Sequence, residues 1–572
     1  MPQALNEQIR KSGIAKKDIS IYIKEAGAGG KVVASLNAGK TRTPASVIKV
    51  LTTYAALLKL GFNYRWQMKF YTTGSVRNGV LNGDLLIKGF GDPTLKSSDL
   101  AKIVSYIKAE GIRSVKGNIV IDRSYFKVGN KDSSGFDENP YSAYNAMPDA
   151  MMFNERVSTV CVTPKKRSVT KKYVDHSYKV VNNLKYVNKS CRGKYAWPRV
   201  KIDKSTPTTR MILNGQVSKR CGKQNICKVV TKPYKSFYYA LKEKMKSEGV
   251  PVRGTMKLKK IPQNATELFT YYSPSLEKII SKTSKKSNNL YARHLLLLLG
   301  AKVYGAPATL QKGRDAIIKI LSSKGALGTG VLRLDNGSGL SRVAKMNAKL
   351  LASMYDHAYD RYGQRWMDTL SIAGVDGTIK RRFRGTVVRN RAWMKTGTLR
   401  RVKNIGGYVK NKAGKYYTVV IIVNSTKAKY RGAKLQNEIM KWLVNTSAKP
   451  SLKQKKHTVK PKKSTLIKPK PISKKRDIKQ IKRKKPDLKK VETNKVKTKS
   501  SKKYYYVQVG SYKRKPSAAY MRKIHAQGLP TKVKKTNIYK VLVGPYRKES
   551  TARSVLVKVK KKLNKSAFIT KQ

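Results

Sequence analysis

The most informative residues are a serine and a lysine three positions apart, in the stretch "TPASVIKVLTTYAALLKLG" at 43–61. Apolar side chains surround this segment on nearly every side, which predicts an interior helix that begins near Ser46 and ends at Gly61. A lysine inside such a helix is costly unless it has a partner or a purpose. Because residues three apart share a helix face, Ser46 could be a nucleophile and Lys49 the base that takes its proton.

The spacing alone leaves a simpler interpretation open. In that interpretation Ser46 caps the helix and the Lys49 amine extends to water. The same spacing recurs elsewhere in this lysine-rich chain, as at 275–278 and 500–503, where nothing else suggests catalysis. Other residues must therefore decide between a cap and a catalyst.

Two further motifs follow in the chain, "SNN" at 287–289 and "KTGT" at 395–398. The first falls at a predicted break between two helices and the second on a predicted strand. With Ser46 and Lys49 they match the serine–lysine acyl-transfer set of penicillin-binding proteins and class A β-lactamases. Three motifs in this order favour the catalytic interpretation over the helix cap.

Each motif contributes a residue that acyl transfer needs. Burial and the nearby cation of Lys395 would lower the pKa of Lys49, so that its neutral amine can deprotonate Ser46. Ser287 could relay a proton to the leaving amine. Asn289 could bond the substrate's backbone amide and orient the Lys49 amine.

The third motif is expected to hold the substrate. Lys395, with the hydroxyls of Thr396 and Thr398, could bind a substrate carboxylate. Backbone N–H groups of Ser46 and Thr398 would form an oxyanion hole. Gly397, which has no Cβ, would let the strand edge approach the substrate closely.

The order of predicted elements indicates an α/β domain interrupted by an insertion. A hairpin at 18–37 and the interior helix come first, and helices, three strands and a closing helix come last. We therefore predict a discontinuous domain at 1–62 and 262–446. The segment between them, 63–261, has short strands and many turns, and we predict a mainly-β insertion.

The chain changes character after this domain. Residues 447–503 are dominated by lysine and proline and predict an extended, disordered linker. From residue 504 the stretches "YVQVGSY" and "YKVLVGPY" form an internal repeat, each followed by a helix-like segment. We predict a βαββαβ, ferredoxin-like domain over 504–572.

Composition limits the partners. The chain has 126 Lys+Arg against 30 Asp+Glu, a net charge of +96, which favours a polyanion or an anionic surface. We expect no transmembrane helix, because no apolar run reaches 18 residues.

The four cysteines form no Cys-x-x-Cys pair, so we expect no metal and no other cofactor. One or two disulfides and free buried thiols both remain open for Cys161, Cys191, Cys221 and Cys227.

On these motifs, residues 1–446 resemble the low-molecular-mass class C penicillin-binding proteins, the D-alanyl-D-alanine carboxypeptidases and endopeptidases of peptidase family S13. Four other stretches carry the likeness: "IKGFGDPTL" (87–95), "NAMPDAMMFNE" (145–155), "DNGSGLSR" (335–342) and "GGYVKNKAGK" (406–415). The resemblance implies a penicillin-binding transpeptidase-like fold, shared with serine β-lactamases, and a large insertion for which a β-lactamase has no room. By analogy Arg342 would bind an acidic group of the stem peptide. Arg400 and Asn154 differ from the residues that the family carries at these positions. The differences bear on the expected stem-peptide selectivity and not on the core chemistry.

Residues 504–572 resemble the SPOR domain, a peptidoglycan-binding module of cell-division proteins, through Gly510 and the Gly544-Pro545 pair. The resemblance implies binding to glycan strands stripped of peptides. An RNA-recognition module shares the topology, but its signature is missing here. Five tyrosines could stack on sugar rings or form sheet core: Tyr504, Tyr505, Tyr506, Tyr512 and Tyr546.

Together the resemblances imply a D-Ala-D-Ala carboxypeptidase or D,D-endopeptidase with a Ser46 acyl-enzyme, acylated by β-lactams and directed to the wall or septum. The sequence does not separate the two activities. The alternatives are a non-catalytic peptidoglycan-binding division scaffold, a β-lactamase or esterase of the same fold, and a basic nucleic-acid binder; we expect no nucleic acid. The start "MPQALNEQIRKSG" is polar, so a periplasmic location implies a trimmed leader or a misassigned start.

Overall fold

We analysed a computed structural model of the protein. It describes residues 1–446 and, further on, 505–512, 516, 524, 527, 529, 531–535, 539–546, 549–564 and 567–571. The chain divides into two units, residues 1–455 and 456–572, and each is described by itself. The predicted linker at 447–503 lies outside the described residues. Among the residues described, no helix has the length and apolar character needed to cross a bilayer.

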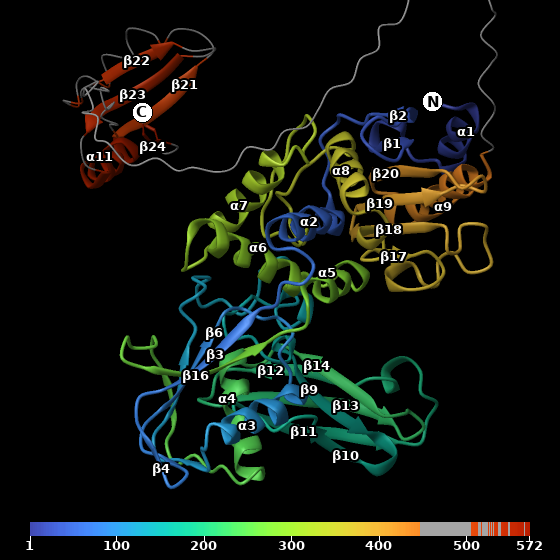
Figure 1. Ribbon diagram of the computed structural model, residues 1–572. Coiled ribbons are helices and arrows are strands. Elements are labelled where there is room, and N and C mark those ends of the chain that lie inside the picture. The colour runs from blue at the N-terminus through green and yellow to red at the C-terminus, as the bar shows by residue number, and fades with distance from the viewer. Residues whose placement is uncertain are drawn as a thin grey trace, which may run out of the picture. The chain divides into compact units, whose positions relative to one another are not determined.

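A six-stranded antiparallel sheet lies at the centre of the first unit (Figure 1), in the order β17-β18-β19-β20-β1-β2. The N-terminal hairpin therefore pairs with strands from the far end of the unit, and Ile21 of β1 lies opposite Ile421 of β20. The predicted hairpin and the three predicted strands are all present. The strands are β1 (Ile19–Glu25), β2 (Val32–Leu36), β17 (Ser371–Ile372), β18 (Ala392–Leu399), β19 (Val402–Lys410) and β20 (Tyr416–Asn424).

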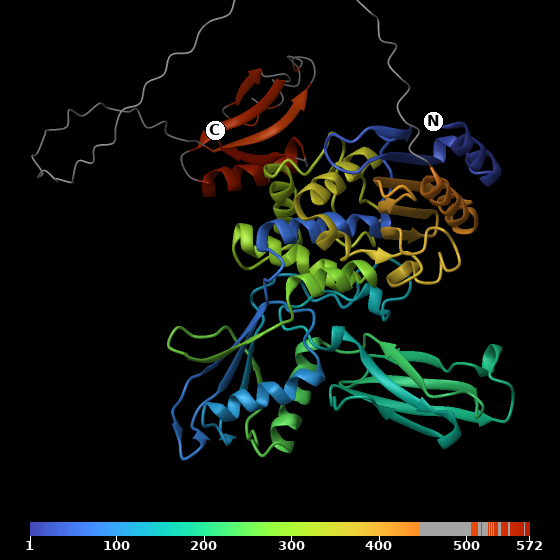
Figure 2. The same ribbon diagram turned by 45° about the vertical axis from the view of Figure 1, so that its right-hand side comes forward.

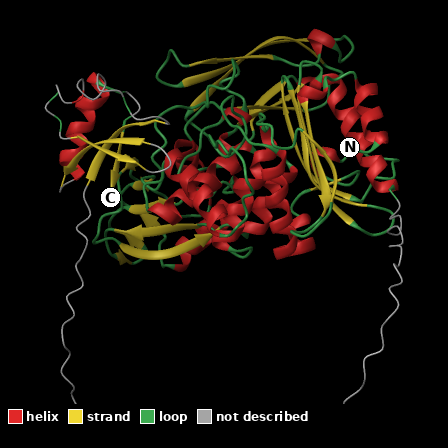
Figure 3. Cartoon of the chain, turned by 90° about the horizontal axis from the view of Figure 1, so that it is seen from above, coloured by secondary structure: helices red, strands yellow, loops and turns green. Residues whose placement is uncertain are grey.

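Both faces of this sheet are buried, which explains the continuous apolar run in β20. Val419 and Ile421 face α1 (Gln3–Ser12) and α9 (Ala428–Asn445). Val420, on the other face, packs in a second core with a group of helices, which Figure 3 shows from above in red. These helices are α2 (Lys49–Leu60), α5 (Leu276–Lys285), α6 (Asn289–Tyr304), α7 (Leu310–Ser323) and α8 (Ala348–Met367).

The segment between α2 and α5 extends away from this helical core in two parts (Figures 1 and 2). A five-stranded sheet, β15-β8-β6-β3-β16, shares a core with α3 (Leu100–Ala109) and α4 (Pro233–Ser247). We did not predict these helices, although α3 buries residues at helical spacing, Leu100, Ile103, Val104 and Ile107. Its strands are β3 (Gln67–Thr72), β6 (Leu85–Gly89), β8 (Ile119–Asp122), β15 (Met256–Leu258) and β16 (Thr266–Tyr272).

Two three-stranded sheets form the other part and share one core, in the orders β10-β9-β14 and β11-β13-β12. Of the pairings left open for the cysteines, the structure has one disulfide, between Cys191 and Cys221, whereas Cys161 and Cys227 are free. The strands are β9 (Ser158–Thr163), β10 (Ser168–Lys171), β11 (Tyr178–Val187), β12 (Arg199–Asp203), β13 (Thr209–Ser218) and β14 (Gln224–Lys228). A small sheet elsewhere in the insertion contains β4 (Val76–Arg77), β5 (Val80–Leu81) and β7 (Ser114–Val115).

The second unit contains a four-stranded antiparallel sheet in the order β22-β23-β21-β24. The two copies of the repeat are the neighbouring strands β21 and β23. Tyr505 and Tyr546 lie partly buried against its core, and Tyr504 lies outside the described residues. The helix predicted after the first copy falls largely on residues that are not described. The described elements are β21 (Tyr505–Tyr512), β22 (Thr531–Lys535), β23 (Tyr539–Tyr546), α11 (Glu549–Lys562) and β24 (Phe568–Lys571).

Candidate active site

Ser46 lies in a short 3-10 turn, Ala45–Ile48, immediately before α2. Its side chain caps neither this turn nor the helix, so the capping interpretation is wrong. The preceding residue, Ala45, has a left-handed backbone with φ 48°. A non-glycine residue adopts this conformation only when its surroundings enforce it, and such residues gather at functional sites.

Side chains from the central sheet hold the segment before Ser46. Asn404 of β19 donates through Nδ2 to the carbonyls of Thr43 and Pro44, at 2.9 and 2.8 Å. Asn424 of β20 accepts from the Thr43 N–H at 2.8 Å. These bonds fix the turn that presents the serine hydroxyl, because buried backbone groups strongly favour having partners.

Two glycines let neighbouring backbone approach this turn. A Cβ on Gly397 would lie 2.8 Å from the Pro44 oxygen and 3.1 Å from the Ser46 nitrogen. A Cβ on Gly339 would lie 2.0 Å from the Ala45 oxygen. In the structure the missing side chain of Gly397 leaves room for the Ser46 turn, and the predicted close approach of this strand edge to substrate stays a prediction.

Lys49 is completely buried, with no exposed surface. Its Nζ lies 2.8 Å from Ser46 Oγ and donates to Asn289 Oδ1 at 2.7 Å and to the Ser338 carbonyl at 2.5 Å. Burial lowers the pKa of Lys49 well below its usual value, and the charges of Lys395 and then Arg293 lower it further. None of the three partners is charged. An uncharged amine can donate its two N–H groups to Asn289 and Ser338 and accept from the Ser46 hydroxyl, so the geometry can support a neutral Lys49 next to the serine.

Lys395 and Ser287 form a second pair at the same site. Lys395 is buried on β18, and its Nζ donates to Ser287 Oγ at 2.9 Å and to the Thr396 carbonyl at 2.7 Å. Burial lowers the pKa of Lys395 to about 7. Ser287, between α5 and α6, has a left-handed φ of 51°. The structure thus brings together the first residues of all three motifs.

The amide of Asn289 is engaged at both ends. Its Oδ1 accepts from Lys49, and its Nδ2 donates to the carbonyl of Tyr144, in the insertion, at 3.1 Å. One N–H group of Nδ2 and one lone pair of Oδ1 remain for a substrate amide, so the predicted hydrogen bond to substrate stays a prediction. The contacts favour the other predicted role, which is to orient the Lys49 amine.

The remaining predicted residues lie at or near the surface. Thr398 is exposed on β18, and Thr396 Oγ1 lies 2.9 Å from the hydroxyl of Thr378. Arg342 is exposed; it donates to the Phe136 carbonyl at 3.1 Å and lies over the Phe136 ring at 5.0 Å. The substrate contacts predicted for these residues stay predictions.

The two departures from the family occupy different environments. Arg400 is exposed at the end of the third motif. The side chain of Asn154 bonds Ser97 inside the insertion, accepting from its N–H at 3.0 Å and donating to its hydroxyl at 2.9 Å. These contacts give Asn154 a structural role within the insertion.

Sequence reasoning missed three contributors to this site. Ser338 acts through its carbonyl, and a backbone group leaves no signal in residue type. Asn404 gives no signal without the fold that places it beneath the turn. Arg293 is a buried cation in an otherwise apolar helix, the signal that drew attention to Lys49; it donates to the Ala146 carbonyl at 2.5 Å, and burial lowers its pKa to about 10.

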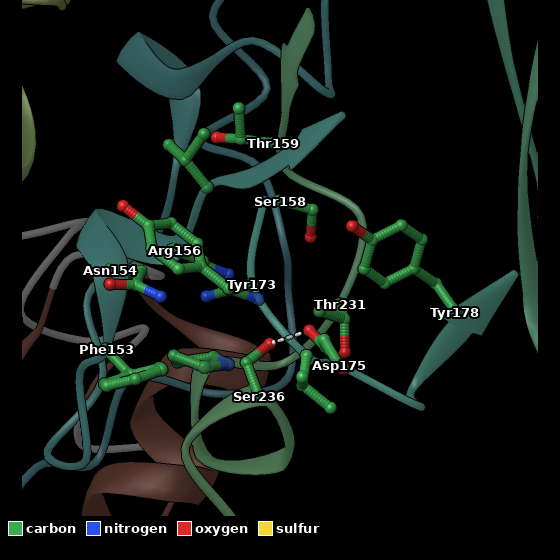
Figure 4. A pocket seen from close by; sticks show the side chains of 13 residues that line it. Phe153, Asn154, Arg156, Ser158, Thr159, Tyr173, Asp175, Tyr178, Thr231 and Ser236 are labelled. Carbon is green, nitrogen blue, oxygen red and sulfur yellow. Dashed lines mark hydrogen bonds between the residues drawn. The ribbon is translucent and has the colours of Figure 1, made fainter. Parts of the chain in front are cut away.

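A separate cavity lies in the insertion and contains none of the motif residues (Figure 4). It measures about 20 Å³, room for about one water molecule. Its polar wall includes Asp175, which accepts from the Ser236 hydroxyl at 2.6 Å. The cavity is too small for a peptide substrate. Among the described residues, no group of three or more His, Cys, Asp or Glu could hold a metal ion.

Each of the two parts of the chain matches a known protein family. Residues 1–446 match the D-Ala-D-Ala carboxypeptidase 3 (S13) family, and residues 501–571 match the SPOR domain. The chain is 26% identical over 402 residues to D-alanyl-D-alanine carboxypeptidase DacB of Haemophilus influenzae, covering 69% of this chain and 83% of that protein. It is 28% identical over 407 residues to a D-alanyl-D-alanine carboxypeptidase of Actinomadura, covering 68% and 74%.

The fold also matches a solved structure. Penicillin binding protein 4 from Haemophilus influenzae superposes with a TM-score of 0.67 at 22% identity, over 78% of this chain and all of that one. At this level of identity the match shows the shared fold. The fold and both resemblances predicted from the sequence are thereby confirmed.

Proposed function

The chain belongs to the D-Ala-D-Ala carboxypeptidase 3 (S13) family, and on that premise we propose that it is a serine-type D,D-peptidase of peptidoglycan stem peptides with Ser46 as nucleophile. One observation carries the assignment of residues: the buried Nζ of Lys49 lies 2.8 Å from Ser46 Oγ, among neutral acceptors. A neutral amine at hydrogen-bond distance meets the geometric requirement for a general base.

Acylation begins when the neutral Lys49 amine takes the Ser46 proton. The serine oxygen attacks the carbonyl carbon of the D-Ala-D-Ala bond, and the backbone N–H groups of Ser46 and Thr398 stabilise the resulting oxyanion. The charged Lys395, with Thr396, holds the terminal carboxylate. Uncharged Lys49 and charged Lys395 thus have complementary tasks within one buried site.

The leaving amine must gain a proton before it departs. Ser287 bonds Lys395, so its hydroxyl can pass a proton to the amine nitrogen and regain one from Lys395. The proton that Lys49 took from Ser46 then passes to Lys395, which leaves Lys49 neutral and Lys395 charged again. D-alanine, or the cross-linked neighbouring strand, then leaves. Water attacks the acyl-enzyme with Lys49 again as base, and Asn289 keeps the amine in place through its bond at 2.7 Å.

Digestion of defined wall fragments tests this function. Purified protein is incubated separately with a monomeric pentapeptide fragment and with a cross-linked dimer, and the products are separated by chromatography. We expect release of D-alanine, cleavage of the dimer, or both, and Lys49→Met should abolish each activity that is present. If the folded protein cleaves neither fragment, the proposed activity is wrong, and a scaffold function becomes the better explanation.

The C-terminal unit supports a location at the cell wall. We propose that residues 504–572 bind denuded glycan strands and that the enzyme acts in the periplasm. Purified sacculi should retain the full chain and release a chain that ends at residue 503. Retention on DNA that falls steeply with salt, without retention on sacculi, would instead support a nucleic-acid binder.

A further inference from the structure

The second motif is held from outside the catalytic core by a glutamate of the insertion. The Oε2 atom of Glu155 accepts from Asn288 Nδ2 at 3.0 Å. Its Oε1 atom accepts from Lys282 Nζ at 2.6 Å and from the Tyr291 hydroxyl at 3.1 Å. The carboxylate therefore contacts both α5 and α6, the two helices between which the motif lies.

Asn288 links this carboxylate to the catalytic residues. It is the middle residue of the motif, and its Oδ1 caps α6 by accepting from the Tyr291 N–H at 3.1 Å. Ser287 precedes it with a left-handed backbone and bonds Lys395, and Asn289 follows it and bonds Lys49. A shift of Asn288 would therefore move both catalytic neighbours.

Glu155 is presented by an unusual stretch of backbone. Three successive residues, Asn154, Glu155 and Arg156, have left-handed φ values of 45°, 54° and 61°. Such backbone is costly for residues other than glycine and persists only where the surroundings enforce it. Strain of this kind is concentrated at functional sites. Here the side chain of Glu155, at the centre of the strained turn, contacts Asn288 of the second motif.

Both neighbours of Glu155 anchor the turn within the insertion, and both also line the small cavity that Figure 4 shows. Asn154 bonds the backbone and hydroxyl of Ser97. Arg156 is buried, donates to the Met147 carbonyl at 2.9 Å and pairs with Asp132. The insertion thus supplies a rigid support from which the Glu155 side chain reaches the helices.

From these contacts we infer that Glu155 is a positioning residue for acyl transfer: it fixes Asn288 and thereby the positions of Ser287 and Asn289. The inference rests on the proposed function. It assigns the insertion a part in catalysis, because the strained turn completes the support of the second motif. Loss of the carboxylate should slow acylation without preventing the domain from folding.

The charges around Glu155 keep it ionised at neutral pH. Burial alone would raise the pKa of its carboxyl, but bonds from Lys282 and Tyr291 and the charge of Lys96, 3.9 Å away, outweigh burial, and the pKa lies below its usual value. The neutral Asn288 amide therefore donates to a carboxylate. A second carboxylate at position 288 would repel it.

A double-mutant cycle on the full chain tests the inference, with the second-order rate of acylation by a fluorescent penicillin as readout. Glu155→Gln should acylate about tenfold more slowly, because a charged hydrogen-bond acceptor is replaced by a neutral one. Asn288→Asp keeps the helix cap but places two carboxylates about 3 Å apart, so it should be slower still. In the double variant the amide introduced at position 155 can donate to the carboxylate introduced at position 288, which should restore at least the Glu155→Gln rate.

The pH dependence separates positioning from a general structural role. The rate of Asn288→Asp relative to wild type should rise as the pH falls from 8 to 5.5, because the paired carboxylates then share a proton. Glu267→Gln is the matched control. Glu267 lies on β16 of the five-stranded sheet and, like Glu155, pairs with a lysine, Lys69 at 2.7 Å, so loss of its charge should leave the rate unchanged.

Three results would overturn the inference. These are a Glu155→Gln rate within twofold of wild type, a double variant no faster than Asn288→Asp, or a relative Asn288→Asp rate that does not change with pH. The same cycle followed by urea unfolding measures the coupling of the two side chains without any acylation. Failure of wild-type acylation with that coupling intact contradicts the proposed function, whereas absence of coupling contradicts the role of Glu155.

Discussion

Replacement of Gly397 by alanine should displace the nucleophile directly. The added Cβ would lie 2.8 Å from the Pro44 oxygen, whereas ordinary contacts begin near 3.4 Å, so strand and turn must separate by about 0.6 Å. Gly397 does not need a left-handed backbone, so strain of its own conformation plays no part. Overpacking of this kind costs about 1–3 kcal/mol, and a displacement approaching 1 Å can lower a catalytic rate about 100-fold.

We therefore expect Gly397→Ala to be acylated by a fluorescent penicillin about 10- to 100-fold more slowly than wild type, with a lowered Tm. Stopped-flow fluorescence measures the rate, and thermal unfolding measures the stability. Gly39→Ala is the matched control, because a Cβ there meets no atom within 4 Å. If Gly397→Ala retains the wild-type rate and Tm, the strand does not constrain the serine turn as the distances indicate.

Further predictions concern the turn, the lysines and the disulfide. Asn404→Ala should slow acylation about tenfold in the stopped-flow assay, because the Pro44 carbonyl loses its 2.8 Å donor; an unchanged rate would contradict this support of the turn. Activity on carboxylate-bearing peptides should fall above about pH 7, where Lys395 loses its charge, but not with a thioester that lacks a carboxylate. Burial holds the pKa of Lys395 at about 7 in the folded chain, so between pH 7 and 10.5 the unfolded chain binds more protons than the folded chain. The unfolding free energy should therefore rise with pH across this window. Urea titration should show a smaller rise in Lys395→Met. Reduction of the insertion's disulfide, which closes a loop of 30 residues, should destabilise the insertion by about 3–4 kcal/mol in calorimetry.

The reactive side chains could be predicted because their chemistry is a property of residue type. A lysine in an apolar helix, three positions after a serine, already identifies Lys49 and Ser46 as a candidate pair. The helix break at 287–289 and the strand that carries Lys395 also follow from local pattern. The sequence did not show which local backbone positions these side chains, such as the left-handed conformation of Ala45 just before the serine.

The supporting groups were harder to predict, for different physical reasons. The Ser338 carbonyl carries no signal of residue type. Glu155 lies more than 100 residues before the motif that it supports, and only the folded insertion brings the two together. Asn404 and Arg293 act through contacts that depend on the packing of the whole sheet and helix core. Support of a site is therefore a property of the fold, whereas the reacting atoms can be read from the chain.

The most direct test of the account is the site of covalent modification by a penicillin. Intact protein is incubated with benzylpenicillin, its mass is measured, and the modified peptide is then sequenced by mass spectrometry. We expect one adduct, located on Ser46, and none on folded Ser46→Ala. An adduct on another residue, or none on folded wild-type protein, would contradict the assignment of Ser46 and Lys49 as nucleophile and base.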